Sequence, residues 1–253
     1  MSGAIYPDLA GRVVLVTGGA TGIGEAIVRG FARQKARVAF VDIQDGPATA
    51  LAAELRAAGG DVHFEHADLT DIAALRRAVE TIRAKLGPIT ALVNNAALDD
   101  RHATPDVTPE LWDRLIAVNL KHVFFMAQAV LPDMVAARKG SIVNFSSISW
   151  MTGQGGMAVY TAAKSAMLGL TRSLARDYGQ YDIRANAVAP GWIRTGRQER
   201  LWIKPEDETR AIAAQCLKRW LKPDDVARVV VFLTSDEAAA ITGQHHVVDG
   251  GRV

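Results

Sequence analysis

Short apolar, β-branched runs recur along the chain and alternate with longer stretches of helical periodicity. Most of these runs do not alternate apolar with polar residues, so both of their faces are expected to be buried, as in a parallel sheet covered by helices. The runs are 13–16, 38–41, 62–64, 91–93, 142–145, 183–188 and 246–248. The pattern predicts an α/β fold, in which a doubly wound parallel sheet of seven strands forms one domain over 1–253.

Several polar residues and prolines predict where helices begin. Stretches 47–58 and 72–86 carry apolar residues three and four positions apart, as amphipathic helices do. Asp71 and Thr108 are expected N-caps. Pro109 is expected in the first turn of the helix that Thr108 caps, and Pro223 in the first turn of a further helix. The least regular region, 192–208, is expected to form a loop or a pair of short helices that acts as a substrate lid.

The first chemical signal is the glycine-rich segment 17–24, with the sequence T-G-G-A-T-G-I-G. It follows the first apolar run directly and opens a helical pattern. Glycines in that position let backbone N–H groups approach a pyrophosphate at the positive end of a helix. Strand, glycine loop and helix in this order predict the dinucleotide site of a Rossmann fold.

The second signal is Asp42, which ends the second run 18 residues after Gly24. An acid about 20 residues beyond the glycine motif can accept hydrogen bonds from an adenosine ribose. Its charge would repel a 2′-phosphate, and neither the glycine segment nor Ile43 and Gln44 supply a compensating cation. The sequence therefore favours NAD over NADP, although Lys35 and Arg37 precede the strand and leave dual use open.

The third signal is Tyr160 with Lys164 four residues on, hence on one face of a helix. An ordinary tyrosine is a poor base at neutral pH, and a neighbouring ammonium is expected to lower its pKa by favouring the phenolate. Ser147 follows the run 142–145, so its hydroxyl is expected at the carboxyl edge of the sheet. These three side chains predict a proton-transfer site.

Composition excludes several classes of protein. The chain has 29 Lys+Arg against 27 Asp+Glu, a net charge of +2, so charge-driven binding to nucleic acid or to a membrane is not expected. Cys216 is the single cysteine, which excludes a disulfide within the chain and a thiolate metal site. No secretory signal is evident at the start. We expect a cytoplasmic protein without a metal.

Taken together, these motifs resemble the short-chain dehydrogenase/reductase family over nearly the whole chain. The resemblance implies a catalytic tetrad of Asn119, Ser147, Tyr160 and Lys164. In it, Tyr160 is the general base, Lys164 holds the nicotinamide ribose and lowers the pKa of Tyr160, Ser147 orients the substrate hydroxyl, and Asn119 holds a water in the proton path.

The resemblance also implies a set of cofactor contacts. Asp68 and Val118 would flank the adenine, and Asn94 would border the nicotinamide ribose. Ala97 replaces the glycine usual in the family, and a small rearrangement without loss of binding is expected. The full set is Gly18, Thr21, Gly22, Ile23, Gly24, Asp42, Asp68, Leu69, Asn94, Ala96, Val118, Tyr160, Lys164, Pro190, Gly191, Ile193 and Thr195.

A narrower likeness, to bacterial aldose 1-dehydrogenases acting on D-xylose, L-arabinose or D-galactose, is carried by 99–102, 144–150, 195–199 and 213–218. It implies NAD-dependent oxidation of the anomeric hydroxyl of a cyclic aldose to the lactone. Sugar contacts are expected from Asn95, Ser147, Ser149, Gln154 and Tyr160, with Trp150 or Trp192 against the sugar ring. Arg101 and His102 are expected mainly to form a solvated loop.

Two other functions remain open from the residues. One is a secondary-alcohol or polyol dehydrogenase, or a 3-oxoacyl reductase, with the same tetrad. The other is a nucleotide-binding regulatory module without catalysis, since a fold alone does not prove a function. The glycine- and glutamine-rich stretch 150–156 favours a small polar substrate over an acyl chain.

The stretches 110–136 and 160–178 carry more apolar surface than one sheet face can cover, which predicts an oligomer. The family resemblance points to a homotetramer. The expected interface residues are Phe124, Phe125, Met126, Met167, Leu168 and Leu170.

Overall fold

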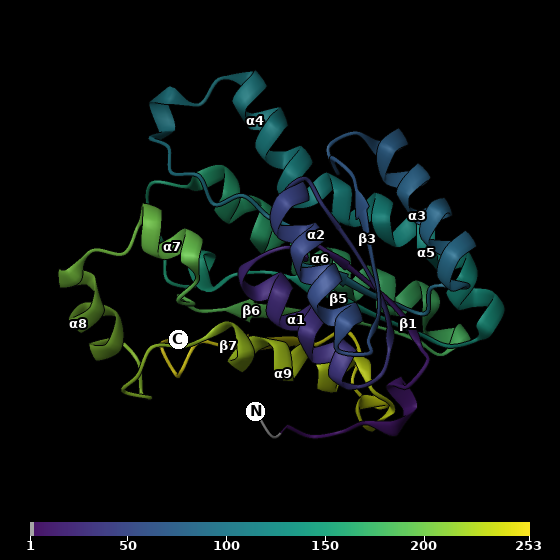
Figure 1. The fold of residues 1–253 in the computed structure, drawn as a ribbon. Coiled ribbons are helices and arrows are strands. Elements are labelled where there is room, and N and C mark those ends of the chain that lie inside the picture. Colours follow the sequence, from purple (N-terminus) through teal and green to yellow (C-terminus); the bar gives the residue numbers. More distant parts are fainter. Residues whose placement is uncertain (1–2) are drawn as a thin grey trace.

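The computed structural model describes residues 3–253 and contains one seven-stranded parallel sheet with the strand order β3-β2-β1-β4-β5-β6-β7 (Figure 1). The strand order reverses direction between β1 and β4, which defines the doubly wound topology. The strands are β1 (Val13–Thr17), β2 (Arg37–Asp42), β3 (Asp61–His66), β4 (Ala91–Asn94), β5 (Gly140–Phe145), β6 (Ile183–Pro190) and β7 (His245–Val248). The predicted fold class and all seven predicted strands are confirmed.

Helices cover both faces of this sheet. They are α1 (Gly22–Arg33), α2 (Asp45–Ala57), α3 (Ile72–Leu86), α4 (Pro109–Ile116), α5 (His122–Ala137), α6 (Ala158–Tyr178), α7 (Gly196–Leu201), α8 (Pro205–Ala213) and α9 (Pro223–Thr234). Val14 and Val16 face a core formed with α1, α2 and α9. Val13 and Leu15 face a second core, formed with α3, α5 and α6. The twofold alternation along β1 thus buries both faces of the strand.

The edges of the sheet and the helix starts refine the sequence predictions. The central strands are buried apart from Arg37 in β2 and Arg184 in β6. The strands β3 and β7 are partly exposed because each has a neighbouring strand on one side only. Asp71 caps α3 by accepting hydrogen bonds from the backbone N–H groups of Ala73 and Ala74. Thr108 caps α4, and Pro109 and Pro223 begin α4 and α9 as predicted.

The long helix predicted over 110–136 is interrupted. A π-helical turn at Ala117–Lys121 separates α4 from α5. Within this turn the amide nitrogen of Asn119 donates to the carbonyl of Leu115, 3.0 Å away. Such single π-turns in α-helices are frequent at functional sites. The periodicity of the sequence does not reveal the interruption, because apolar residues continue through it.

The same segment, Pro109–Ala137, is long and apolar enough to span a membrane, with a hydropathy of 1.4. Its buried residues, however, pack within the second core: Met126 and Val130 lie against strand residues such as Ile142. We therefore interpret it as a core helix of the α/β domain.

The predicted interface residues divide into two groups. Met126 and Met167 are completely buried within the single chain, so their assignment to an interface is wrong: the monomer core already covers them. Phe124 is 46% exposed, and Phe125 lies edge-on to it with ring centroids 5.3 Å apart.

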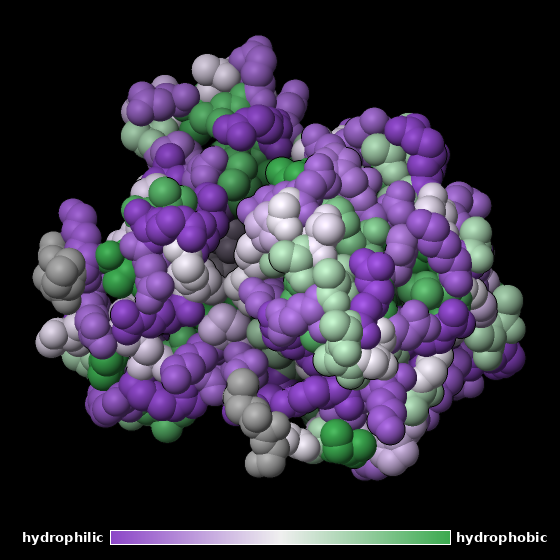
Figure 2. Space-filling model, in the orientation of Figure 1, coloured by the Kyte–Doolittle hydropathy of each residue, from purple (hydrophilic) through white to green (hydrophobic). Residues whose placement is uncertain are grey.

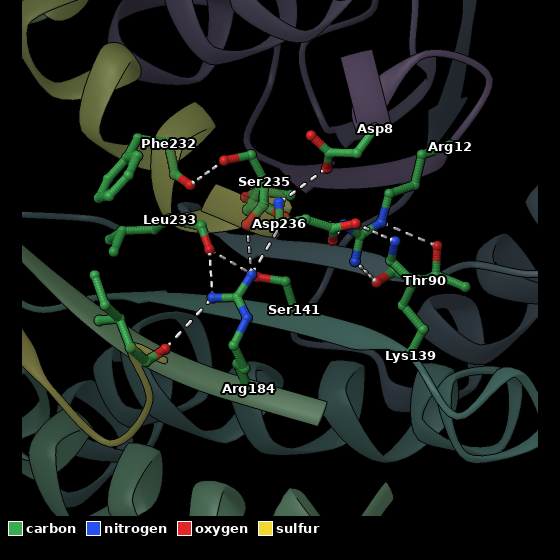
Figure 3. Close-up of polar contacts among 12 residues, drawn as sticks. Asp8, Arg12, Thr90, Lys139, Ser141, Arg184, Phe232, Leu233, Ser235 and Asp236 are labelled. Carbon is green, nitrogen blue, oxygen red and sulfur yellow. Dashed lines mark hydrogen bonds and ion pairs between the residues drawn. The ribbon is translucent and has the colours of Figure 1, made fainter. Parts of the chain in front are cut away.

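The amino edge of the sheet contains a polar cluster that ties α9 to the strands (Figure 3). Arg184 of β6 donates to the carbonyls of Leu233 (2.7 Å) and Ser235 (3.0 Å). Arg12, just before β1, donates to the carbonyl of Thr234 (2.9 Å). Burial lowers the pKa of both guanidinium groups, and the carboxylates of Asp8 and Asp236 act against this shift. Two cations thus satisfy the carbonyls at the negative end of α9.

Candidate active site

The glycine loop lies between β1 and the first turn of α1, at the carboxyl edge of the sheet. Gly18 has a φ of +65°, a conformation that L side chains rarely adopt. A Cβ on Gly24 would lie 1.8 Å from the carbonyl oxygen of Gly18, so no side chain fits there. The N–H groups of Gly18, Gly19 and Ala20 donate to Val41 and Asp42, so it is the positive end of α1 that would meet a phosphate, as a dinucleotide requires.

Asp42 lies at the end of β2, beside this loop. Its Oδ2 accepts a hydrogen bond from the N–H of Ala20 (2.9 Å) and its Oδ1 one from the N–H of Gln44 (3.0 Å). Oδ1 also accepts a longer bond from Gln44 Nε2 (3.5 Å), so the carboxylate is fixed and Oδ2 keeps a lone pair for a ribose hydroxyl. A cavity of about 250 Å³ lies alongside, lined by Ala20, Thr21, Glu25, Arg29, Pro47, Ala50, Leu51 and Glu54. This arrangement fits the adenosine half of a dinucleotide.

Asn95 differs from its predicted role as a sugar ligand. Its amide nitrogen donates to the carbonyls of Thr17 and Gly18, each 3.0 Å away. The hydroxyl of Thr17 in turn accepts hydrogen bonds from the N–H groups of Asn95 and Ala96. The side-chain N–H groups of Asn95 are thus already hydrogen-bonded to Thr17 and Gly18, and Asn95 supports the glycine loop.

The structure brings Ser147, Tyr160 and Lys164 together beside the carboxyl end of β5. Ser147 precedes a short 3₁₀ turn and its Oγ accepts a hydrogen bond from the N–H of Ser149 (3.1 Å). Lys164 is buried, lies with its Nζ 5.7 Å from the ring centroid of Tyr160, and donates to the carbonyl of Phe145 (2.9 Å). The one-face arrangement predicted for the Tyr–Lys pair is confirmed by α6.

The pKa of Tyr160 differs in direction from the prediction. Burial and the negative charge of Asp99 raise the pKa of Tyr160 to about 12, while hydrogen bonding to Ser147 and the charge of Arg101 act the other way. Burial also lowers the pKa of Lys164 to about 8. Desolvation disfavours both charged forms, and here it outweighs the attraction between ammonium and phenolate that the sequence suggested.

Asn119 lies in the π-turn at Ala117–Lys121, and His122 follows it as the first residue of α5. Asn119 Oδ1 accepts from the N–H of Leu98 (2.9 Å), and its amide donates to the Leu98 carbonyl (3.0 Å). His122 is completely buried, and its ring nitrogens find no hydrogen-bond partner of good geometry in the described part of the chain. Burial, and secondarily the charge of Lys164, lower the pKa of His122 to about 3, although the backbone of Ala117 and Val118 opposes this shift.

The remaining predicted cofactor residues follow the carboxyl edge of the sheet. Asp68 is exposed after β3, and its Oδ1 accepts from the N–H and hydroxyl of Thr70. Thr195 caps α7, and its methyl group would lie 3.3 Å from a Cβ placed on Gly22. Ile23 lies in the first turn of α1 and Val118 in the π-turn at Ala117–Lys121. At the carboxyl ends of strands, or within three residues after them, are Leu69, Asn94, Pro190, Gly191 and Ile193.

The two tryptophans predicted to face the sugar are each held by a hydrogen bond. The indole N–H of Trp150 donates to Ser146 (3.2 Å), and its ring lies 5.9 Å from that of His245. The indole N–H of Trp192 donates to Gln198 (2.9 Å), and its ring lies edge-on to Trp220. Both rings are thus already positioned by the protein.

The two predicted polar sugar ligands differ from each other. Ser149 is buried, and its hydroxyl has no hydrogen-bond partner among the described residues. Gln154 is exposed, with a 3.4 Å contact to the carbonyl of Gly155. The hydroxyl of Ser149 is therefore enclosed by the protein without a partner, whereas Gln154 is free to turn toward a ligand.

Comparison with known proteins agrees with this site. A family model described as enoyl-(acyl carrier protein) reductase matches residues 18–252. The chain is 50% identical to the probable galactose dehydrogenase GalD of Rhizobium meliloti, over 97% of this chain and 96% of that protein. It is 45% identical to the D-xylose 1-dehydrogenase of Caulobacter vibrioides, over 99% of both chains. The chain belongs to the short-chain dehydrogenase/reductase family.

A solved structure shares the fold. The blue fluorescent protein from a metagenomic library, in complex with NADPH, has a TM-score of 0.88 and 36% identity, covering 97% of this chain and 99% of its own. As a member of the family, the chain is an oxidoreductase that uses a nicotinamide cofactor.

The sequence analysis of this dehydrogenase missed a network that joins the predicted lid to the site. Arg197 donates to Asp99 (3.2 Å) and Asp100 (2.8 Å), and Gln198 donates to Asp99 (2.6 Å). The region 192–208 contains the short helix α7 and the first turn of the short helix α8, in agreement with the predicted pair of short helices. Both ends of the network lie in segments that carry the resemblance, but spacing along the sequence does not reveal that the two segments meet.

For Ala97, which follows β4, the sequence predicts a small rearrangement without loss of binding. Ala97 is not among the described residues with a positive φ, so the position does not require a glycine. The substitution is therefore accommodated without backbone strain.

Proposed function

We propose that this dehydrogenase oxidises the anomeric hydroxyl of a cyclic aldose, such as D-galactose, L-arabinose or D-xylose, to the aldonolactone with NAD. The supporting observation is that Ser147, Tyr160 and Lys164 lie together in a chain 45–50% identical, over nearly its whole length, to relatives named for galactose and D-xylose. The partly exposed carboxylate of Asp99 and the exposed amide of Gln154 favour a hydroxylated substrate over an acyl chain.

The residues present fit a dinucleotide. The glycine loop and the start of α1 would hold the pyrophosphate, Asp42 the adenosine ribose, and Lys164 the nicotinamide ribose. When bound, the nicotinamide supplies the acceptor for the hydride that leaves C1. Figure 2 shows the surface hollowed between the part that carries α7 and the part that carries α1 and α2, which leaves room for a ligand along this edge.

In the proposed mechanism Tyr160 takes the proton of the C1 hydroxyl as C1 is oxidised. Ser147 orients this hydroxyl, and its hydrogen bond to Tyr160 favours the phenolate. Lys164 favours the same form by its charge, against burial and Asp99. Asn119 fixes Leu98 and, in the family's scheme, holds a water in the path by which the proton leaves.

The test is formation of NADH, followed at 340 nm, with a panel of aldoses, polyols, secondary alcohols and 3-oxoacyl thioesters. We expect turnover with at least one aldose and recovery of a lactone that hydrolyses to the aldonate. No NADH from any aldose would rule out the sugar assignment. Turnover confined to secondary alcohols or acyl ketones would establish the alternative dehydrogenase or reductase.

We further propose that the enzyme is a cytoplasmic homotetramer and that 192–208 acts as its substrate lid. The exposed Phe124 and its neighbour Phe125 offer apolar surface for subunit contact. Light scattering should return about four times the chain mass of 27.1 kDa. A mass of one chain at micromolar concentration would contradict the assembly.

A further inference from the structure

The loop after β4, residues 98–102, is fastened to the site at both ends. At one end, the backbone N–H and carbonyl of Leu98 both bond to the side chain of Asn119. At the other end, the backbone N–H of His102 donates to the carbonyl of Gly156 (2.9 Å). The ring Nε2 of His102 accepts a hydrogen bond from the N–H of Val159 (3.3 Å), the residue before Tyr160. Asp99 is thereby held in a fixed place relative to the general base.

The carboxylate of Asp99 is oriented but not saturated. Arg197 Nε donates to its Oδ1 and Gln198 Nε2 to its Oδ2, so each oxygen retains a lone pair. The side chain is 20% exposed, which leaves one side accessible to a small ligand. Because this loop is bonded to Val159, next to Tyr160, the charge of Asp99 acts on the reacting groups and raises the pKa of both Tyr160 and Lys164.

The charge of this carboxylate is also incompletely balanced. Arg197 is shared with Asp100, to which it donates at 2.8 Å. Arg101 lies over the ring of Trp202, 5.1 Å from its centroid, and is not paired with Asp99 in any hydrogen bond of the described residues. A fixed, partly exposed carboxylate with free lone pairs is well suited to accept hydrogen bonds from sugar hydroxyls.

We propose that Asp99 is a substrate-binding residue that accepts a hydrogen bond from a ring hydroxyl of the aldose other than the C1 hydroxyl, with Arg197 and Gln198 holding it in place. This inference rests on the proposed function. It makes Asp99 a specificity-determining residue, because a substrate without that hydroxyl would leave the desolvated carboxylate one hydrogen bond short. The lid then contributes to recognition through α7.

The test compares wild type, Asp99→Asn and Asp99→Ser on the best aldose and on its monodeoxy analogues, with Asp100→Asn as the matched control. Asp100 bonds to the same arginine but is more exposed, at 42%. In wild type, one deoxy analogue should lose about tenfold or more in kcat/KM. In the Asp99 variants the parent sugar should fall by a similar factor, and the penalty for that analogue should disappear.

The outcomes separate the two proposals. If wild type oxidises no aldose, the proposed function fails first. If wild type oxidises an aldose but the deoxy penalty persists in both Asp99 variants, only the role of Asp99 is overturned. If Asp100→Asn removes the same penalty, the network acts as a lid fastening and Asp99 does not bind the sugar.

Discussion

The two edges of the sheet use buried polar groups in opposite ways. At the amino edge, Arg12 and Arg184 bond to the carbonyls that end α9, with Asp8 and Asp236 nearby. At the carboxyl edge, the hydroxyl of Ser149 has no hydrogen-bond partner among the described residues. The first arrangement satisfies helix-end carbonyls with charge. The second leaves a buried hydroxyl without a partner beside the catalytic Ser147.

This difference indicates what each edge can tolerate. A buried polar group without a partner costs stability, roughly 1–3 kcal/mol, and a protein retains such groups mainly where a ligand will satisfy them. Changes at the amino edge should therefore reduce stability and leave activity unchanged. Changes at the carboxyl edge should reduce activity and leave stability largely unchanged.

The largest expected effect is at the carboxyl edge. Tyr160→Phe removes the proton acceptor and should lower kcat by about 10²–10⁴-fold, with unchanged thermal unfolding and NAD affinity. Steady-state kinetics, calorimetric unfolding and cofactor titration check the three expectations. A variant that keeps more than about a tenth of wild-type kcat, a loss below about 1.4 kcal/mol, would show that Tyr160 is not the base.

The counterpart at the amino edge is Arg184→Leu. It leaves the carbonyls of Leu233 and Ser235 without their charged donor and should cost about 3 kcal/mol of unfolding free energy, while kcat at 25 °C stays close to wild type. Urea unfolding at fixed protein concentration measures the loss.

The matched control for that variant is Arg219→Leu at the other end of α9. Arg219 pairs with Asp225 but its side chain is 52% exposed, so little change in stability is expected. Equal losses in the two arginine variants would refute the special role of the buried cluster.

The next effect concerns pH and His122. Its folded pKa of about 3 lies below the unfolded value of about 6.5. Between these values the unfolded chain binds a proton that the folded chain does not, so stability falls as the pH falls. From pH 7 to pH 5, wild type should lose about 2 kcal/mol more than His122→Gln. Urea unfolding at the two pH values measures this difference, and parallel losses would mean that the ring is protonated in the folded protein.

The smallest expected effect concerns cofactor choice and Asp42. Wild type should prefer NAD over NADP by about tenfold or more in kcat/KM, from like-charge repulsion of about 1.4 kcal/mol. Asp42→Asn removes the charge but keeps an acceptor for Ala20 or Gln44, so it should raise efficiency with NADP. Asp42→Ala should also weaken the loop and lose more with NAD. A wild-type preference for NADP would contradict the ribose contact.

The apolar runs were sufficient to predict the strands because strands buried on both faces need continuous apolar sequence. They could not predict the π-turn at Ala117–Lys121, since a polar contact from Asn119, and not the periodicity, marks it. Likewise, Met126 and Met167 are as apolar as Phe124, and only packing decides which of them the core buries.

For the site, the sequence by itself determined which residues lie at the carboxyl edge: the glycine loop, Asp42, Ser147 and the Tyr160–Lys164 pair follow strands or share a helix face, and local geometry fixes such positions. The tertiary structure alone decided their surroundings. It turned Asn95 toward the glycine loop, raised the pKa of Tyr160 through burial and Asp99, and joined Asp99 to Arg197 and Gln198 across about a hundred residues of chain. Desolvation and long-range hydrogen bonds depend on which segments meet in space, and spacing along the sequence does not encode that.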